Sequence, residues 1–140
     1  MNQPPAPRAI RRRKPKINVV YNIGQCVWSI GGRLRADGKM DKMMQISFWA
    51  IITSDADEPL AILEAYPEET ELISSNFSHT LLPKRPTRII IHAFVFPIVG
   101  TVGQPLRTRF VLKDQYGRSY LTPKTTFRWI SSGIEKQLDH

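Results

Sequence analysis

The chain has 140 residues, which is the size of one domain. Hydrophobic residues make up 41% of it, so we expect a packed core, and a wholly disordered chain is excluded. No apolar run approaches the roughly 20 residues that a membrane-spanning helix needs, and no apolar segment after Met1 resembles a signal peptide. We therefore expect a cytoplasmic or nuclear protein that neither crosses a membrane nor is secreted.

The net charge of +8 is concentrated at the N-terminus. Residues 1–16 contain no acidic side chain and include four prolines, which suit neither a helix nor a central strand. The basic residues of this segment are Arg8, Arg11, Arg12, Arg13, Lys14 and Lys16. We interpret residues 1–16 as a flexible basic arm. Three roles are open for it: contact with nucleic-acid phosphates, a nuclear import signal, or a solvated tail with no specific partner.

After this arm the pattern becomes that of β-strands. Residues 17–21 are rich in β-branched side chains, and residues 26–30 alternate between apolar and polar, as strands with one buried face do. A glycine pair at 31–32 predicts a bulge or bend, and the Asp-Gly pair at 37–38 predicts a tight turn. Residues 44–53 also alternate but become apolar on both faces, so we expect a central strand that is covered on both sides near its end.

The middle of the chain continues this pattern. Residues 54–59 predict an acidic loop, and residues 60–66 fit either a short helix or a strand, of which we favour the strand. Residues 72–82 predict one extended segment near a sheet edge, followed by a proline-bracketed connector at 83–86. Residues 88–99 are the most apolar run in the chain, and they predict a central buried strand.

The last third predicts two more strands separated by turns. Glycines at 100 and 103 indicate a turn, and residues 106–112 alternate as a single strand does. The sequence from Asp114 to Gly117 suits a type I turn. Residues 125–129 predict the last strand, and residues 131–140 a frayed tail.

Together these segments predict an all-β protein, a small antiparallel β-sandwich of seven or eight strands. Its general character is immunoglobulin-like, although the single cysteine excludes the Cys…Trp…Cys spacing of true immunoglobulin domains. We expect the sandwich to span residues 17–130, between the basic arm and the frayed tail.

Residues suited to catalysis or to metal binding are few. Cys26 is the only thiol, and it needs a nearby base such as His79 or His92 to act as a nucleophile. The alternative is a small buried hydrophobic residue. No closely spaced histidine pair, calcium loop or phosphate-binding glycine loop is present. We therefore expect no catalytic residue, no metal, no cofactor and no small-molecule substrate.

Two sets of residues are candidates for contact with a partner. Arg107, Arg109 and Lys113 lie on one side of one predicted strand, with Arg118 just beyond the following turn, so they could form a second basic stripe. The alternative is ordinary outward-facing charge, which discourages edge pairing. Trp49 and Trp129 lie on partly polar faces, where each is either a partner anchor or a core residue.

These features predict a non-catalytic interaction or assembly module that binds a protein partner or itself. The alternative is a structural protein associated with nucleic acid through the basic arm. In layout, a basic arm joined to a β-sandwich is similar to small viral coat proteins, whose arms hold the packaged genome. A third hypothesis, a hydrolase that uses Cys26 and a histidine, has less support from the residues.

Overall fold

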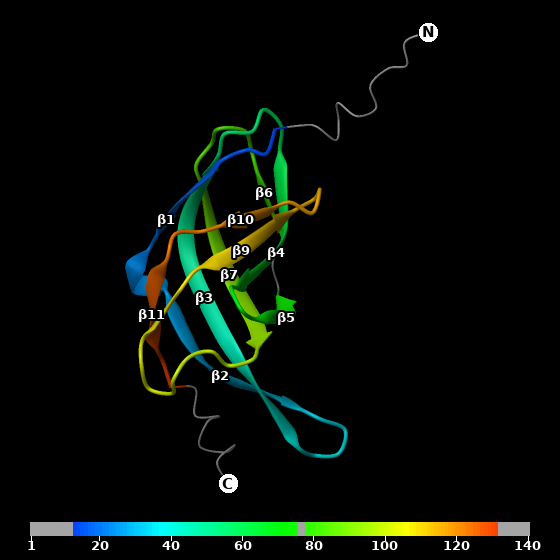
Figure 1. The fold of residues 1–140 in the computed structure, drawn as a ribbon, viewed down its shortest axis with the longest axis vertical. Helices are drawn as coiled ribbons and strands as arrows, with labels where there is room; N and C mark the ends of the chain where they lie inside the picture. The colour runs from blue at the N-terminus through cyan, green and yellow to red at the C-terminus, as the bar shows by residue number, and fades with distance from the viewer. Residues whose placement is uncertain (1–12, 76–77, 132–140) are drawn as a thin grey trace.

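The computed structural model of the chain describes residues 13–75 and 78–131, which form two β-sheets packed face to face (Figure 1). The larger sheet has seven strands, and the smaller has four. The only helical element in the described residues is a short 3-10 turn, η1 (Ile23–Gln25). The prediction of an all-β sandwich is therefore confirmed.

The larger sheet is built around one long strand. In sequence order its members are β1 (Ile17–Tyr21), β2 (Val27–Leu34), β3 (Met40–Ser54), β5 (Glu71–Ser75), β7 (Thr87–Phe96), β8 (Leu106–Thr108) and β11 (Thr125–Trp129). The spatial order is β5-β7-β3-β2-β11-β8, and β1 pairs with β3 beyond the end of β2. β3 has 15 residues, so both β1 and β2 pair with the same side of it, while β7 pairs with the other.

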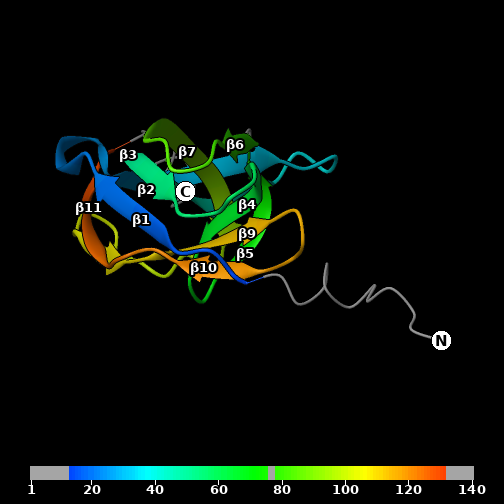
Figure 2. The same ribbon diagram turned by 90° about the horizontal axis from the view of Figure 1, so that it is seen from above.

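The smaller sheet covers one face of the larger one. It contains β4 (Leu60–Pro67), β6 (His79–Leu81), β9 (Phe110–Asp114) and β10 (Ser119–Leu121), in the order β10-β9-β4-β6. All three pairings are antiparallel. Seen from above, β9 and β10 lie on the opposite side of the molecule from β7 (Figure 2). The strand expected at 60–66 is thus confirmed as β4.

The strand count and one pairing differ from the prediction. The described residues form eleven strands in place of seven or eight. Two predicted segments each divide between the two sheets, and β10 lies outside every predicted strand. The segment 72–82 supplies β5 to one sheet and β6 to the other, and the segment 106–112 divides at Arg109 into β8 and β9. Alternation alone does not reveal such a crossing, because the residues keep their period on both sides of the break. In addition, β2 and β11 pair in parallel, so the sandwich is not wholly antiparallel.

Two strands are less covered than the sequence predicts. The end of β3 is expected to be covered on both faces, but Ile51 is 45% exposed. β7 is expected to be fully buried, but its residues alternate between buried and open positions, and Ile90 is 46% exposed. Both residues are exposed for the same reason: the smaller sheet covers only the inner face of the larger sheet, and no described segment covers the outer face of β3 and β7 beside them.

The predicted turns at 37–38 and 114–117 are confirmed, but the predicted bulge or bend at 31–32 is wrong. The turn at 37–38 joins β2 to β3, and Gly38 has a φ of +84°, a conformation that favours glycine. The backbone N–H of Gly117 donates to the carbonyl of Asp114, as in the expected turn between β9 and β10. The bulge or bend expected at 31–32 is absent from β2, whose register with β3 runs without a shift from Val27 to Leu34.

The core lies between the two sheets and is centred on Phe48. Its ring packs edge-on against Tyr21 at 5.1 Å and against Phe110 at 4.7 Å, measured between ring centroids. Phe127 of β11 lies 6.4 Å from Phe48 and 5.8 Å from Phe110. Strands from the beginning, middle and end of the chain therefore meet at one buried side chain.

The predicted domain ends fall partly outside the described residues. Residues 1–12 of the arm and residues 132–140 of the C-terminal tail are not described. Residues 13–16, which we assigned to the arm, lie against the body of the protein: the backbone N–H of Lys16 donates to the carboxylate of Asp55 at 2.7 Å, and Pro15 is buried.

Candidate interaction surface

The outer face of the larger sheet carries four large apolar side chains close together. Val20 is 57% exposed, Ile51 45%, Ile90 46% and Trp49 37%. We call these four residues the apolar cluster. Single exposed hydrophobic residues are normal on a protein surface, but a contiguous group marks a site where another surface binds.

Strand register brings the apolar cluster together. Val20 of β1 lies directly opposite Ile51 of β3, and Trp49 of β3 lies directly opposite Ile90 of β7. Because side chains alternate between the faces of a strand, Trp49 and Ile51 point the same way, away from the core. The cluster thus spans three adjacent strands.

A groove of about 250 Å³ opens beside this cluster. Val20, Trp49 and Ile51 form part of its wall, and the end of β1 contributes Tyr21. Arg88 of β7 also lines the groove, and it lies opposite Ile51 in the register. The groove therefore combines an apolar wall with one guanidinium group.

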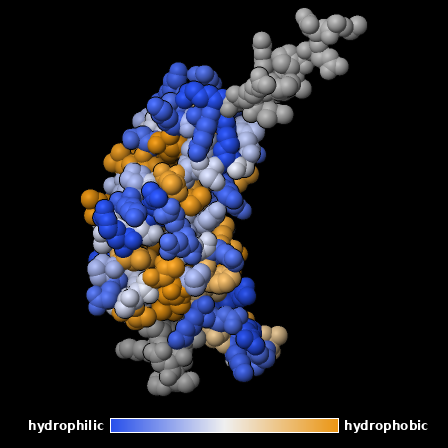
Figure 3. Space-filling model, in the orientation of Figure 1, coloured by the Kyte–Doolittle hydropathy of each residue, from blue (hydrophilic) through white to orange (hydrophobic). Residues whose placement is uncertain are grey.

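The outer face of β7 remains partly apolar beyond the cluster. His92 and Phe94 are half-buried and pack edge-on against each other, with ring centroids 5.0 Å apart. Phe96 is 47% exposed and lines a second groove of about 490 Å³, together with Met43 and charged residues of the β2–β3 hairpin. On the face of the molecule shown in Figure 3, by comparison, polar and apolar side chains are interspersed.

The two tryptophans proposed as anchors lie in different surroundings. Trp49 points outward from the larger sheet, as described above. Trp129 is half-buried and packs edge-on against the buried Trp28, with ring centroids 4.8 Å apart. The indole N–H of Trp28 donates to the carbonyl of Gln104 at 2.9 Å. Trp129 therefore packs against the core, and Trp49 is the more accessible of the two.

The described part of the basic arm contacts the acidic loop between β3 and β4. The guanidinium of Arg13 pairs with Asp55 at 3.4 Å. The backbone N–H of Lys16 and the Arg13 side chain together hold the pKa of Asp55 below its ordinary value, against a smaller opposing effect of burial. The ammonium group of Lys14 lies 4.9 Å from the centre of the Tyr120 ring. Arg8, Arg11 and Arg12 lie outside the described residues.

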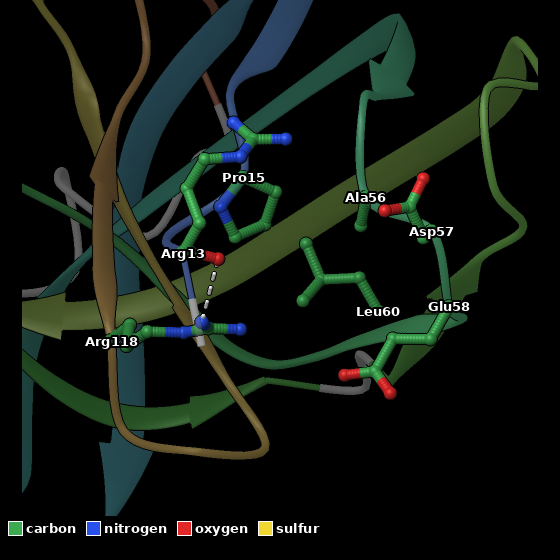
Figure 4. A pocket seen from close by; sticks show the side chains of 7 residues that line it. All are labelled: Arg13, Pro15, Ala56, Asp57, Glu58, Leu60 and Arg118. Carbon is green, nitrogen blue, oxygen red and sulfur yellow. Dashed lines mark hydrogen bonds between the residues drawn. The ribbon is translucent and has the colours of Figure 1, made fainter. Parts of the chain in front are cut away.

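A shallow pocket of about 400 Å³ lies between this part of the arm and the acidic loop (Figure 4). Arg13 and Arg118 line it on one side, and Asp57 and Glu58 lie across it beyond Leu60. The Arg118 side chain donates to the backbone carbonyl of Arg13 at 3.4 Å, which links the arm to the β9–β10 hairpin. The pocket has charges of both signs, and part of this charge is already paired within the chain.

The proposed second basic stripe does not lie on a single strand. Arg107 is exposed on β8, Arg109 lies in the break before β9, and Lys113 is on β9, opposite Glu64 of β4. The Nε of Arg109 lies 2.8 Å from a carboxylate oxygen of Glu68. Because this contact favours both charged forms, it raises the pKa of Arg109 and lowers that of Glu68.

Arg118, the fourth residue of the proposed stripe, pairs with a buried carboxylate. Its Nε lies 2.7 Å from Asp114, which also accepts a hydrogen bond of 2.6 Å from the Tyr120 hydroxyl. Burial alone would raise the pKa of Asp114, but these bonds and the backbone N–H groups of Tyr116 and Arg118 bring it below the ordinary value. Arg118 therefore has a structural role in the β9–β10 turn.

The lone thiol is buried in the core. Cys26 is 1% exposed, and its Sγ lies 3.5 Å from the backbone carbonyl of Asn22. Burial raises the pKa of the Cys26 thiol to about 11, so the nucleophilic thiolate is scarce at neutral pH. The two histidines of the hydrolase hypothesis lie on β6 and β7: His79 is partly buried near the edge of the smaller sheet, and His92 is on the outer face of the larger sheet.

Two further properties of the described residues bear on function. Within residues 13–75 and 78–131, no group of three or more His, Cys, Asp or Glu side chains is placed to hold a metal ion. No helix in that same part of the chain combines the length and the apolar character needed to cross a membrane.

Comparison with known proteins does not assign the chain to a family. No protein-family model matches the sequence, and a search of the curated proteins finds no match. The function is therefore inferred from the geometry of the surface.

Of the apolar cluster, the sequence indicates Trp49 as a candidate partner anchor, but it does not indicate the other three residues. Val20, Ile51 and Ile90 are assigned to strands because they are β-branched, and two of them to covered positions. The available signal is the outward parity of Trp49 and Ile51, which share a face opposite that of Phe48. Sequence alone does not say which face the second sheet covers.

Proposed function

We propose that this protein is a non-catalytic interaction module that binds a protein partner through the outer face of its larger sheet. The apolar cluster of Val20, Trp49, Ile51 and Ile90 is the observation that carries this proposal. Burying such a cluster against a partner removes apolar area from water, at about 25 cal/mol for each Å². Tryptophan is also among the residues that contribute most to binding at interfaces.

A matched pair of substitutions tests the proposal. Protein partners are first selected from a displayed library against the full chain, and their affinities are then measured by calorimetry. We expect Trp49→Ala to weaken binding at least about tenfold, as for a central aromatic anchor. The control is Leu63→Ala, which removes a side chain that is 48% exposed on the smaller sheet. Equal effects of the two substitutions would contradict the proposal, provided that both variants keep the wild-type circular-dichroism spectrum.

A second candidate function is nucleic-acid association through the basic arm, and its support is the excess of positive charge in residues 1–16. The test compares the full chain with a variant that lacks residues 1–12, binding a single-stranded oligonucleotide at several salt concentrations. For every phosphate that the shortened chain no longer neutralises, the slope of log affinity against log salt should become shallower by roughly 0.7, the value for single strands. A slope unaffected by the deletion would remove the arm from the argument.

A further inference from the structure

The charge around the apolar cluster points to the chemistry of its partner. Three arginines share the outer face of the larger sheet: Arg88 on β7, Arg107 on β8 and Arg128 on β11. All three are exposed. None of them forms an ion pair with another described residue, in contrast to Arg109 and Arg118.

Acidic groups on this face lie away from the cluster. Asp41, at the start of β3, is already paired with Arg35 at 3.4 Å and with Arg33 at 3.9 Å. Glu71 lies opposite Phe96, at the end of β7 far from Arg88. On the strands that hold the apolar cluster, the charged residue beside it is therefore Arg88, and no carboxylate lies next to Arg88 in the strand register. Arg128 and Arg107 lie farther away on the same face, on β11 and β8 beyond β2.

The groove beside the apolar cluster has no carboxylate in its lining, unlike three other grooves on the described surface. The groove at Arg13 contains Asp57 and Glu58, the groove at Phe96 contains Asp41, and a fourth of about 210 Å³ contains Glu68 and Glu69. In the groove beside Trp49 the one charged lining residue is Arg88. A positive, partly apolar groove complements a ligand that has both an apolar side chain and a negative charge.

Two other occupants fit this surface less well. A second copy of the chain, packed face to face, would bring two sets of these arginines together, and like charges facing each other oppose binding. Single-stranded nucleic acid binds to open sheets through stacked aromatic side chains. Trp49 is the only aromatic member of the apolar cluster, whereas the aliphatic Val20 and Ile51 offer no ring for a base to stack on.

We propose that the groove formed by Val20, Trp49, Ile51 and Arg88 binds an acidic segment of a partner protein. An aliphatic or aromatic side chain of this segment packs against Trp49 and Ile51, and an adjacent Asp or Glu pairs with Arg88. Arg128 and Arg107 extend the positive surface along the same face. This inference rests on the proposed function, since it specifies the partner of the same surface.

The test is a selection of random twelve-residue peptides displayed on phage, with the full chain as the target. We expect the selected peptides to contain Asp or Glu beside a large apolar side chain. Fluorescence anisotropy of synthetic versions should show at least a tenfold loss of affinity for Arg88→Glu, and substitution of the peptide's carboxylates by lysine should restore binding to that variant. The control is Lys39→Glu, which makes the same charge change at an exposed position of the β2–β3 hairpin.

The outcomes separate this inference from the proposed function. One outcome is that peptide binding requires Trp49, but the peptides have no acidic residue and bind Arg88→Glu as tightly as wild type. This outcome would support the outer face as the binding surface and would refute the acidic partner. If no selected peptide depends on Trp49 or on the exposed Val20, both ideas fail. Tighter binding of an oligothymidylate than of any peptide, abolished by Arg88→Glu, would refute the peptide and favour nucleic acid on this face. Variants are compared only when their circular-dichroism spectra match the wild type.

Discussion

The buried carboxylate of Asp114 should be a major source of stability in the β9–β10 hairpin. Asp114→Asn keeps an oxygen that can accept from the backbone N–H groups of Tyr116 and Arg118, at 2.8 and 2.9 Å in the wild type. It removes the negative charge that pairs with the Arg118 side chain and accepts from the Tyr120 hydroxyl.

The magnitude follows from the removal of those two interactions. A hydrogen bond to a charged group contributes about 1.5–3 kcal/mol to stability. Part of the loss is offset, because the Tyr120 hydroxyl can turn to accept a hydrogen bond from the new amide. We therefore expect Asp114→Asn to reduce the free energy of unfolding by about 3 kcal/mol, within the usual range for a broken buried pair. For a domain of this size the melting temperature should fall by about 10 °C.

The effect should also depend on pH. Because the folded pKa of Asp114 lies below its ordinary value near 3.8, the carboxylate stabilises the fold above that value. The contribution is lost as the pH falls through the folded pKa. The free energy of unfolding can be measured in urea at pH 7 and at pH 2, followed by tryptophan fluorescence. It should be much lower for Asp114→Asn than for wild type at pH 7, and this difference should be smaller at pH 2. Other carboxylates titrate in both proteins and cancel in the comparison.

Tyr120→Phe is the companion variant, because it removes one of the two bonds and keeps the ring. We expect it to lower stability by about 1.5–3 kcal/mol at pH 7. The reasoning would be refuted if Asp114→Asn changed the free energy of unfolding by less than about 0.5 kcal/mol. It would also be refuted if the difference in the free energy of unfolding between wild type and Asp114→Asn became larger in acid.

Three further predictions concern the core. Phe48→Ala should reduce the free energy of unfolding by about 3–5 kcal/mol, because the ring packs against aromatic side chains of three other strands; a loss below about 1 kcal/mol in urea titration would contradict this. Gly100→Ala should destabilise by about 1–3 kcal/mol and alter tryptophan fluorescence, since the new Cβ would lie 2.6 Å from the Trp28 ring. Gly24→Ala is its control, with 3.7 Å to the nearest atom. Cys26 should react with a thiol reagent at pH 8 only slowly in the native protein and rapidly in urea, because burial raises its pKa to about 11; equal rates would refute its buried position.

The fold class was predictable from sequence because the buried residues repeat with the period of a strand. β11 shows the pattern well: Phe127 is fully buried, and Thr126 and Arg128 on either side are exposed. The turn residues at 37–38 and 114–117 gave correct positions for two hairpins, since their backbone preferences are local.

Pairing and coverage were not predictable, because they depend on residues distant in the sequence. The alternation from Leu106 to Leu112 continues through Arg109, yet the chain changes sheets there. Likewise, the apolar character of Ile51 and Ile90 is the same whether or not a second sheet covers them. The candidate surface therefore required knowledge of which face the smaller sheet occupies.

The arginine positions illustrate the same limit. In the sequence Arg88 is only the start of an apolar run, whereas Arg109 and Arg118 stand out as basic. In the structure the last two are paired with carboxylates from a neighbouring turn and hairpin, and Arg88 is the one beside an apolar groove. A sequence shows where charge lies along the chain but not which charges neutralise one another.

The parallel pairing of β2 with β11 has a consequence for biosynthesis. It places Trp28 beside Trp129, about one hundred residues later in the chain, at a sequence separation comparable to that of the hydrogen bond from Tyr21 to Thr122. The ribosome must therefore release the chain through β11 before the larger sheet can close. Translation that stops before β11 would leave one edge of β2 unpaired and Phe48 without its contact with Phe127.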